Sequence, residues 1–210
     1  LKPSASILLH VDWRTSHRVR VMLDDLLGED HFVNHLIWSY GLGGSSPRRF
    51  ARKHDDILFY CIDPNLYWFD PPLVPATSNR MAGKMKKSTD VLRIPPTPTD
   101  VLDVPSINNL AHERTGYPTQ KPLELLDLLV RACCPPGGSV WDPCSGSGTT
   151  VVAAMNAGRI GFGSDFSLPA IDLASQRLRS QPKNKSTPPE RGQLEFHSMR
   201  DDRPLTDADR

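Results

Sequence analysis

The sequence predicts an α/β domain, and two observations support this fold class. Within residues 139–165, a strand pattern, a loop with two glycines, a helical pattern and a second strand pattern follow one another. Further strand and helix patterns precede this unit, separated from it by a long proline-rich stretch. A length of 210 residues suffices for one such domain with an inserted lobe, so we expect one main domain.

The unit begins with a short strand and a glycine loop. Val140-Trp141 follows the turn Pro135-Pro136-Gly137-Gly138 and is stopped by Asp142-Pro143, which is typical of a buried parallel strand ending at a ligand crevice. Gly146 and Gly148 permit positive φ and lack Cβ atoms. The backbone of this loop can therefore turn sharply and lie against a ligand.

A helix and a second strand complete the unit. Thr149-Thr150 opens a helix that runs through Met155, with Gly158 suited to the C′ position. Residues 160–163 form the next strand. Asp165 follows Gly146 by nineteen residues, near the ~20-residue spacing at which an acid can accept hydrogen bonds from ribose hydroxyls. The unit therefore predicts a nucleoside site.

The loop favours a nucleoside that carries no pyrophosphate. A nicotinamide cofactor would place its pyrophosphate on the helix N-terminus, and the G-x-G-x-x-G fingerprint has a third glycine where this chain has Val151. S-adenosylmethionine is a nucleoside of the favoured kind. A NAD-dependent oxidoreductase using the same loop is the alternative, and a pair of glycines alone also occurs in ordinary turns.

The N-terminal third predicts three strands and a helix. Ser6–Val11 has a buried-strand pattern, and His17–Leu27 places its apolar residues on one helical face that ends at Gly28. Phe32–Tyr40 and Asp56–Ile62 are rich in aromatic and β-branched residues, as expected for strands. The chain begins directly at the first of these strands, so we expect that it starts in the middle of a domain.

Two basic, loop-rich segments are candidate phosphate contacts. Residues 41–53 are rich in glycine and then in arginine, and residues 63–114 combine many prolines with a lysine cluster. A charge run is as often a solvated face as a binding surface. The candidate nucleic-acid contacts are Arg48, Arg49, Arg52, Lys53, Lys84, Lys86 and Lys87.

The remaining elements surround the central unit. Thr115–Pro136 reads as a helix, with Pro122 in its first turn and with Thr119 and Lys121 at its N-terminal end as donors for a carboxylate. After Asp165 we expect a helix at Ala170–Leu178, a polar connector at 180–192 and a short strand at 193–198. The end, 199–210, is charged and expected to fray.

The composition excludes several other classes. No apolar run reaches the ~20 residues that span a bilayer, and the first residues do not begin a signal peptide, so the expected location is the cytoplasm. The four cysteines form no C-x-x-C pair, so we assign no disulfide and no metal site. A net charge of +1 neither supports nor excludes a nucleic-acid partner.

The segment TGYPTQKPLELLDLLVRACCPPGGSVWDPCSGSGTTVVAAMNAGRIGFGSDFS strongly resembles the C-terminal half of the amino-methylating DNA methyltransferases. These enzymes modify adenine N6 or cytosine N4, and the order here is the circularly permuted one, with catalytic motifs before cofactor motifs. The resemblance implies S-adenosylmethionine as cofactor and double-stranded DNA as partner. It extends to the N-terminal third and covers nearly all of residues 1–178.

The resemblance also assigns the cofactor residues. Thr119, Lys121 and Pro122 stand in the family's T-x-K-P segment, which contacts the methionine end of the cofactor. The D-P-F-x-G-x-G-T loop corresponds to Asp142, Pro143, Cys144, Gly146, Ser147, Gly148 and Thr149. Asp165 stands at the ribose-binding acid, with Phe166 beside it. Cys144 replaces the usual Phe, which reduces the apolar surface offered to the cofactor.

A second departure concerns catalysis. The family carries a D-P-P-Y or S-P-P-Y type motif, which holds the flipped base, on a strand before the segment where this chain begins. Asp70-Pro71-Pro72-Leu73 looks similar, but it follows the resembling strands and has Leu73 where the stacking ring belongs, so we interpret it as a turn. The catalytic residues are therefore unknown, and we expect a fragment or an N-terminally shortened form.

The implied fold is the Rossmann-like methyltransferase fold, a mixed seven-stranded sheet flanked by helices, with the strand before Leu1 expected to be missing or disordered. Its parts would be residues 1–62 and 115–198 for the two halves of the core, 63–114 for a target-recognition insertion and 199–210 for a tail. Three alternatives stay open besides the oxidoreductase: a module that binds cofactor or DNA without transfer, methylation of RNA, and methylation of protein amides. A restriction endonuclease is a possible partner, and the oligomeric state is unknown.

Overall fold

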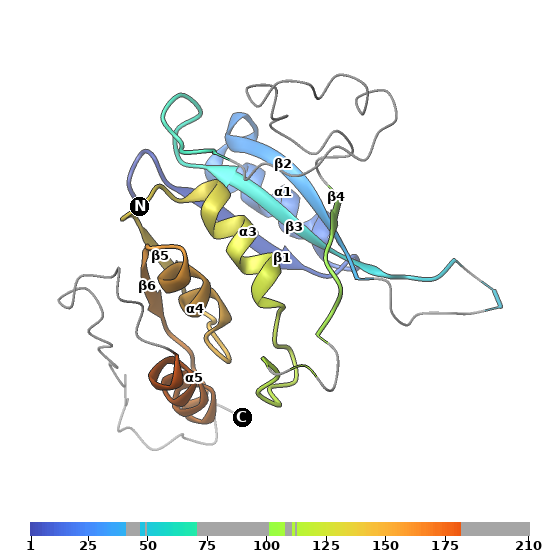
Figure 1. Cartoon of the computed structure of the whole chain (residues 1–210). Helices are drawn as coiled ribbons and strands as arrows, with labels where there is room; N and C mark the ends of the chain where they lie inside the picture. The colour runs from blue at the N-terminus through green and yellow to red at the C-terminus, as the bar shows by residue number, and fades with distance from the viewer. Residues whose placement is uncertain (41–46, 49, 71–100, 108–110, 112, 182–210) are drawn as a thin grey trace, which may run out of the picture.

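The computed structural model describes residues 1–40, 47–48, 50–70, 101–107, 111 and 113–181 (Figure 1). The strands of this part are β1 (Ser6–Val11), β2 (Phe32–Ser39), β3 (His54–Cys61), β4 (Val101–Asp103), β5 (Ser139–Asp142) and β6 (Ile160–Gly163). The helices are α1 (Ser16–Leu27), a 3-10 turn η1 (Glu29–His31), α3 (Leu123–Cys133), α4 (Thr149–Asn156) and α5 (Leu168–Ser180).

The larger sheet has four strands in the order β1-β3-β2-β4. β3 is antiparallel to both of its neighbours, and β4 runs parallel to β2. Six consecutive residues of β3, Asp56–Cys61, are buried, because helices cover both faces of this strand. β1 and β2 therefore run in the same direction and end at the same edge of the sheet.

Two helices pack on opposite faces of this sheet, giving three layers (Figure 1). α1 contributes Leu23 to a cluster with Leu58 and Tyr60 of β3. α3 contributes Leu125 and Leu129 to a second cluster on the other face, with β2 residues that include Trp38. The alternation of side chains along β3 explains how one strand serves both clusters.

The smaller sheet pairs β5 with β6 in parallel, with α4 packed on one face. Val130 of α3 and Val140 of β5 both pack with the alanines of α4, so α3 lies between the two sheets. The opposite face of this sheet carries the neighbouring side chains of Trp141 and Phe162, which are 63% and 54% exposed. The prediction that Trp141 belongs to a buried strand is therefore wrong, because helices cover β5 on one side only in the part described.

The expected helix over Thr115–Pro136 is shorter than predicted. α3 begins only at Leu123, because Pro122 has the extended backbone angles of an N-cap and Gly116 has a φ of 85°. Residues 113–121 form turns instead, and Pro118 also disfavours helical geometry at the residue before it. Gly158 has a φ of 72° just beyond α4, which confirms its predicted role as the residue that ends the helix.

The other boundaries shift by a few residues at most. β3 begins two residues earlier than predicted, α1 one residue earlier, and α5 extends the expected helix at both ends. β4 is a strand that the sequence did not predict within the loop-rich stretch. The described residues contain six strands, four in the larger sheet and two in the smaller one.

Several predictions lie outside the described residues. These are the phosphate contacts at Arg49, Lys84, Lys86 and Lys87, the motif-like Pro71 to Leu73, most of the polar connector, the strand at 193–198 and the tail at 199–210. Within the part that is described, no helix is long and apolar enough to cross a membrane.

Candidate functional site

The glycine loop has the geometry that its sequence predicts. Gly146 and Gly148 have φ values of 51° and 75°, in the left-handed region that glycine tolerates best. The amide of Gly148 donates to the carbonyl oxygen of Ser145 at 2.8 Å, which closes the turn directly before α4. The loop backbone is buried from Gly146 to Thr149, so these glycines allow close packing around the turn.

The carboxylate of Asp142 forms hydrogen bonds at both ends of this loop. Its Oδ1 accepts a hydrogen bond from the amide of Cys144 at 3.0 Å, and its Oδ2 accepts one from the hydroxyl of Thr150 at 2.6 Å. The amide of Ser164 donates to the Asp142 carbonyl oxygen at 2.9 Å, which joins the ends of β5 and β6. The carboxyl end of β5 is therefore a rigid corner between strand, loop and helix.

Asp165 is oriented by two backbone amides. Gly146 donates to Oδ2 at 2.8 Å, and Ser167 donates to Oδ1 at 2.9 Å. A carboxylate offers about four acceptor positions, so each oxygen keeps capacity for another donor such as a hydroxyl. The adjacent ring of Phe166 is fully exposed. An acceptor and an aromatic face thus lie beside each other at the end of β6.

The segment before α3 folds around Gln120. Its Oε1 accepts hydrogen bonds from the amide and hydroxyl of Thr115 at 2.8 and 2.7 Å, and its Nε2 donates to the Glu113 carbonyl oxygen at 2.6 Å. The Glu113 carboxylate accepts from the amide of Leu123 at 3.0 Å, which caps the first turn of α3. These bonds fix the T-x-K-P segment as a compact turn.

This segment touches the glycine loop. A Cβ built on Gly146 would lie 2.8 Å from a ring carbon of Tyr117, so the ring packs directly against the loop backbone. Thr119 is exposed on the same turn. The structure therefore brings together the glycine loop, Asp165 and the backbone segment that carries Thr119 and Lys121.

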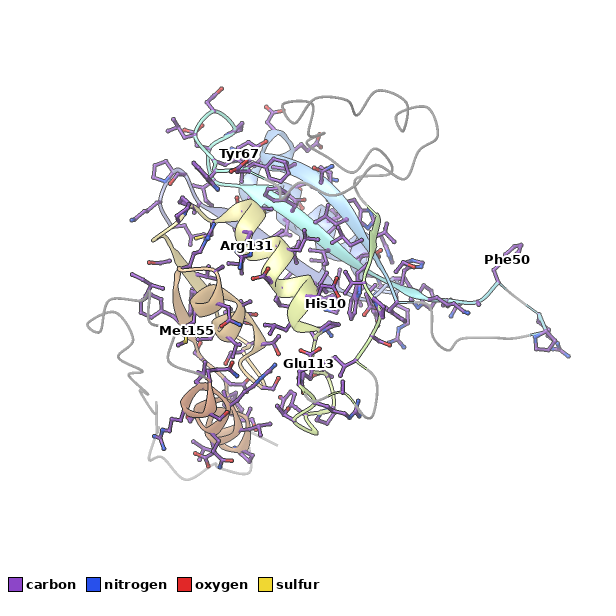
Figure 2. All side chains as sticks on the ribbon, viewed as in Figure 1. His10, Phe50, Tyr67, Glu113, Arg131 and Met155 are labelled. Carbon is purple, nitrogen blue, oxygen red and sulfur yellow. The ribbon has the colours of Figure 1, made fainter. Side chains whose placement is uncertain are left out.

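Lys121 lies toward the larger sheet. Its Nζ is 5.7 Å from the centroid of the Trp38 ring, and burial lowers the pKa of this lysine, while the Asp55 carboxylate opposes that shift. Nε2 of His10 donates to Oδ2 of Asp55 at 3.0 Å. The pKa of His10 is lowered mainly by burial and next by the nearby charge of Lys121. Figure 2 shows His10 near the N-terminal end of α3. Lys121 is thus a partly desolvated cation beside the larger sheet.

The predicted cofactor residues differ in exposure. Buried members are Pro122, Gly146, Ser147, Gly148 and Thr149; half-buried members are Lys121, Asp142 and Asp165; exposed members are Thr119, Pro143, Cys144 and Phe166. The exposed and half-buried members are those with side chains accessible to a ligand.

The predicted phosphate contacts that the structure describes lie between β2 and β3. Arg48 and Arg52 are exposed and Lys53 is half-buried. The guanidinium carbon of Arg52 lies 3.7 Å from the centroid of the Trp13 ring, which holds this cation by a cation–π contact. Figure 2 shows Phe50 projecting away from the body of the protein in the same connection.

Four residues of the site have no role in the sequence prediction: Glu113, Tyr117, Gln120 and Arg177. Tyr117 and Gln120 lie within the recognised segment, so that motif is the signal that could have found them. Glu113 and Arg177 lie outside this motif. Only the folding of the chain brings them into contact with the site. Among the described residues, no group of three or more His, Cys, Asp or Glu side chains could hold a metal ion.

A parallel strand pair with a glycine loop and an acid at its carboxyl end defines an α/β domain of the class that binds nucleoside ligands at that edge. Comparison with known proteins gives the family. Residues 1–176 match the family model described as DNA methylase, with N6 and N4 specificity, and the chain belongs to this family.

Characterised relatives agree with this membership. The chain is 31% identical over 160 residues to the type II methyltransferase M.ScaI of Streptomyces caespitosus, covering 72% of this chain and 51% of the relative. It is 28% identical over 183 residues to M.HpaI of Haemophilus parainfluenzae, covering 86% and 55%. It is 31% identical over 153 residues to the DNA adenine methyltransferase YhdJ of Escherichia coli K12, covering 68% and 51%. The chain therefore spans about half the length of these relatives.

Solved structures share the fold. The M1.HpyAVI–SAM complex aligns with a TM-score of 0.62 at 22% identity, covering 85% of this chain and 76% of the other. The cytosine-N4-specific PvuII DNA methyltransferase aligns with a TM-score of 0.62 at 15% identity, covering 89% and 67%. The expected methyltransferase fold is confirmed by these likenesses.

Proposed function

We propose that this protein transfers a methyl group from S-adenosylmethionine to the exocyclic amino group of adenine N6, or of cytosine N4, in double-stranded DNA. The observation that carries the proposal is the contact between Tyr117 and Gly146, because it joins the T-x-K-P segment to the glycine loop. Membership of the DNA methylase family supports the reaction, and the relative named as an adenine methyltransferase supports adenine as the favoured base.

The residues of the site fit S-adenosylmethionine chemically. Asp165 keeps acceptor capacity for two ribose hydroxyls, and the exposed ring of Phe166 offers a stacking face for an adenine. Lys121 and the exposed hydroxyl of Thr119 are donors for a carboxylate. Burial lowers the pKa of Lys121, so water would screen an ion pair between this lysine and a ligand carboxylate less than it screens a pair at the surface.

S-adenosylmethionine would supply an electrophilic methyl group on a sulfonium. The task of this chain would be to hold that group still: Asp165 at the ribose, Thr119 and Lys121 at the carboxylate, and the loop from Asp142 to Thr149 along the middle. Positioning of this kind accounts for a large part of the rate in a methyl transfer. The residues that hold the flipped base stay unassigned.

The basic residues between β2 and β3 would contact DNA phosphates. Arg48, Arg52 and Lys53 are on this connection, and the cation–π contact of Arg52 with Trp13 supports a preorganised cation there. Residues outside the described part, Arg49, Lys84, Lys86 and Lys87, belong to the same proposal. Each phosphate contact adds to the salt dependence of binding.

The organisation of the chain is also part of this proposal. Residues 1–62 and 115–198 would form the two halves of a circularly permuted core, 63–114 the target-recognition insertion, and 199–210 a tail. The relatives named as type II methyltransferases support a restriction endonuclease as a partner. The proposed location is the cytoplasm. If the enzyme protects a recognition sequence, chromosomal DNA from the source cells should resist the endonuclease that cuts at that sequence. Digestion of this DNA with candidate endonucleases tests this.

The test combines binding with transfer. Calorimetry would measure the affinity for S-adenosylmethionine and for NAD, and transfer of a labelled methyl group to mixed genomic DNA would measure activity. Binding of S-adenosylmethionine with transfer to DNA is the expected result. Binding without transfer would favour a non-catalytic module, and preferential binding of NAD would overturn the assignment.

A matched pair of variants sharpens the test. Asp165→Asn keeps the shape of the side chain but removes its charge, and should weaken S-adenosylmethionine binding at least about tenfold, about 1.4 kcal/mol. Asp172→Asn on the exposed side of α5 is the control, because it makes the same chemical change away from the loop. Equal losses in both variants would contradict the role of Asp165.

A further inference from the structure

Arg177 of α5 is a charged residue in the interior, only 9% exposed. Its Nη1 donates to the hydroxyl oxygen of Thr149 at 2.8 Å and to the carbonyl oxygen of Ser147 at 3.3 Å. The hydroxyl oxygen of Ser147 lies within hydrogen-bond distance of the same nitrogen, at 3.4 Å. One guanidinium nitrogen therefore holds the last part of the glycine loop and the first residue of α4.

The other end of the same guanidinium faces the segment before α3. Nη2 of Arg177 lies 3.9 Å from Oε2 of Glu113, the oxygen that accepts the hydrogen bond from the amide of Leu123. Figure 2 shows Glu113 beyond the N-terminal end of α3, on the side toward α5. The backbone of Glu113 is in turn held by Gln120. Arg177 thus bridges the glycine loop and the T-x-K-P segment, which are far apart in sequence.

Fold stability alone gives a poor reason for a cation at this place. Burial lowers the pKa of Arg177, and the Glu113 carboxylate offsets this only in part. The position next to Thr149 is also the positive end of α4, which disfavours a cation. Apolar side chains commonly replace buried ion pairs without loss of stability. The rigid fork of donors on arginine does, however, suit a residue that must join two segments at a fixed separation.

We infer that Arg177 is a positioning residue for the cofactor site, holding the T-x-K-P segment and the glycine loop at the separation that one ligand molecule spans. The inference rests on the proposed function, because the ligand is taken to be S-adenosylmethionine. Arg177 would act through Thr149, Ser147 and Glu113 rather than by touching the ligand. Its loss would leave both segments folded but would let the distance between them vary.

The first measurement needs no ligand. Hydrogen–deuterium exchange on the full chain would compare wild type with Arg177→Met, and the amides of residues 115–123 should exchange at least tenfold faster in the variant. Arg131→Met is the matched control, because it makes the same chemical change away from the loop. Arg131 pairs with Asp127 on the surface of α3. Arg177→Lys keeps the charge and should restore the protection in part.

The second measurement is calorimetry with S-adenosylmethionine on the same proteins. Arg177→Met should weaken binding at least tenfold, Arg177→Lys less, and Arg131→Met not at all. Glu113→Gln keeps an acceptor for the Leu123 amide but removes the charge that faces Arg177, so it should give an intermediate loss. This variant changes a half-exposed side chain and guards against a failure of Arg177→Met to fold.

The outcomes separate the inference from the proposed function. Binding by wild type with unchanged affinity in Arg177→Met and Glu113→Gln would overturn the inference and leave the proposed function standing. Faster exchange spread evenly over α3, α4 and the sheets would also overturn it, because that pattern indicates a structural role only. Failure of the wild type to bind S-adenosylmethionine would contradict the proposed function and therefore also the inference, whatever the exchange data show.

Discussion

The hydroxyl of Thr150 donates a 2.6 Å hydrogen bond to Oδ2 of Asp142, linking the end of β5 to the first turn of α4. The other oxygen of the same carboxylate accepts from the amide of Cys144. Since the intervening loop makes a turn with two left-handed glycines, this carboxylate is what holds the turn closed between its two ends. The first prediction concerns this bond.

Thr150→Val should destabilise the protein by about 1–2 kcal/mol, because it removes a hydrogen bond to a charged acceptor while keeping the shape of the side chain. Denaturant unfolding followed by circular dichroism would measure the change. Thr119→Val is the control, since Thr119 is exposed and should change stability by less than about 0.5 kcal/mol. Equal effects would show that the Asp142 bond adds nothing.

Gly146→Ala should be more harmful than Gly158→Ala. Both glycines have positive φ, so both variants carry a backbone cost of about 1–2 kcal/mol. Only at position 146 would the new Cβ also meet a neighbour, the Tyr117 ring at 2.8 Å, whereas no atom lies within 4 Å at position 158. Thermal unfolding and calorimetry with S-adenosylmethionine should both show the difference, and addition of Tyr117→Ala should reduce it.

His10 should make stability depend on pH below about 6.5, the usual pKa of histidine. Its pKa in the folded protein is lowered by burial and by Lys121, with Asp55 and Asp56 opposing. The unfolded chain therefore binds a proton first as pH falls, so stability is present above pH 6.5 and decreases below it, by at most about 1.4 kcal/mol per pH unit.

His10→Gln should remove this part of the pH dependence. Urea unfolding of wild type and variant between pH 5 and 8 would measure it, and the difference in the free energy of unfolding should grow toward neutral pH in favour of wild type. A constant difference across this range would contradict the prediction.

Tyr60 should make the protein sensitive to alkali. Burial, followed by the hydrogen bond to Asp24 at 2.6 Å, raises the pKa of Tyr60 to about 12. The unfolded chain then loses its proton near pH 10, so the stability contribution is present below pH 10 and is lost between about pH 10 and 12. Tyr60→Phe should cost about 1–3 kcal/mol at pH 7 and flatten the loss of stability above pH 10 in denaturant unfolding.

The sequence predicted the parts of this molecule that depend on local chemistry. The strand, loop, helix and strand around Gly146 and Gly148 were predictable from local rules. Left-handed backbone favours glycine, and a glycine such as Gly158 commonly ends a helix. The spacing of Asp165 from Gly146 placed an acid at the end of the second strand, and its carboxylate accepts a hydrogen bond from the Gly146 amide; its ribose-binding role stays a prediction. Local rules of this kind need no knowledge of distant contacts.

The parts that depend on the fold were not predictable. Arg177 looks like an ordinary polar position on a helix, and only the packing of α5 against the loop buries it. β4 is a strand because it pairs with residues Ile37 to Ser39 of β2, helped by a hydrogen bond from the Trp38 indole to Val104. Trp141 shows the opposite case, since an apolar residue in a strand is expected inside and is found outside.

α3 packs with two separate clusters, because Leu126 contacts both the larger sheet and the alanines of α4. Without α3, neither the larger sheet nor the unit of β5, α4 and β6 has a complete hydrophobic core. We expect the whole described structure to melt in a single cooperative transition. Two peptides produced by cleavage between Pro105 and Glu113 should reassemble when mixed, with the second peptide supplying the helix that the first one lacks.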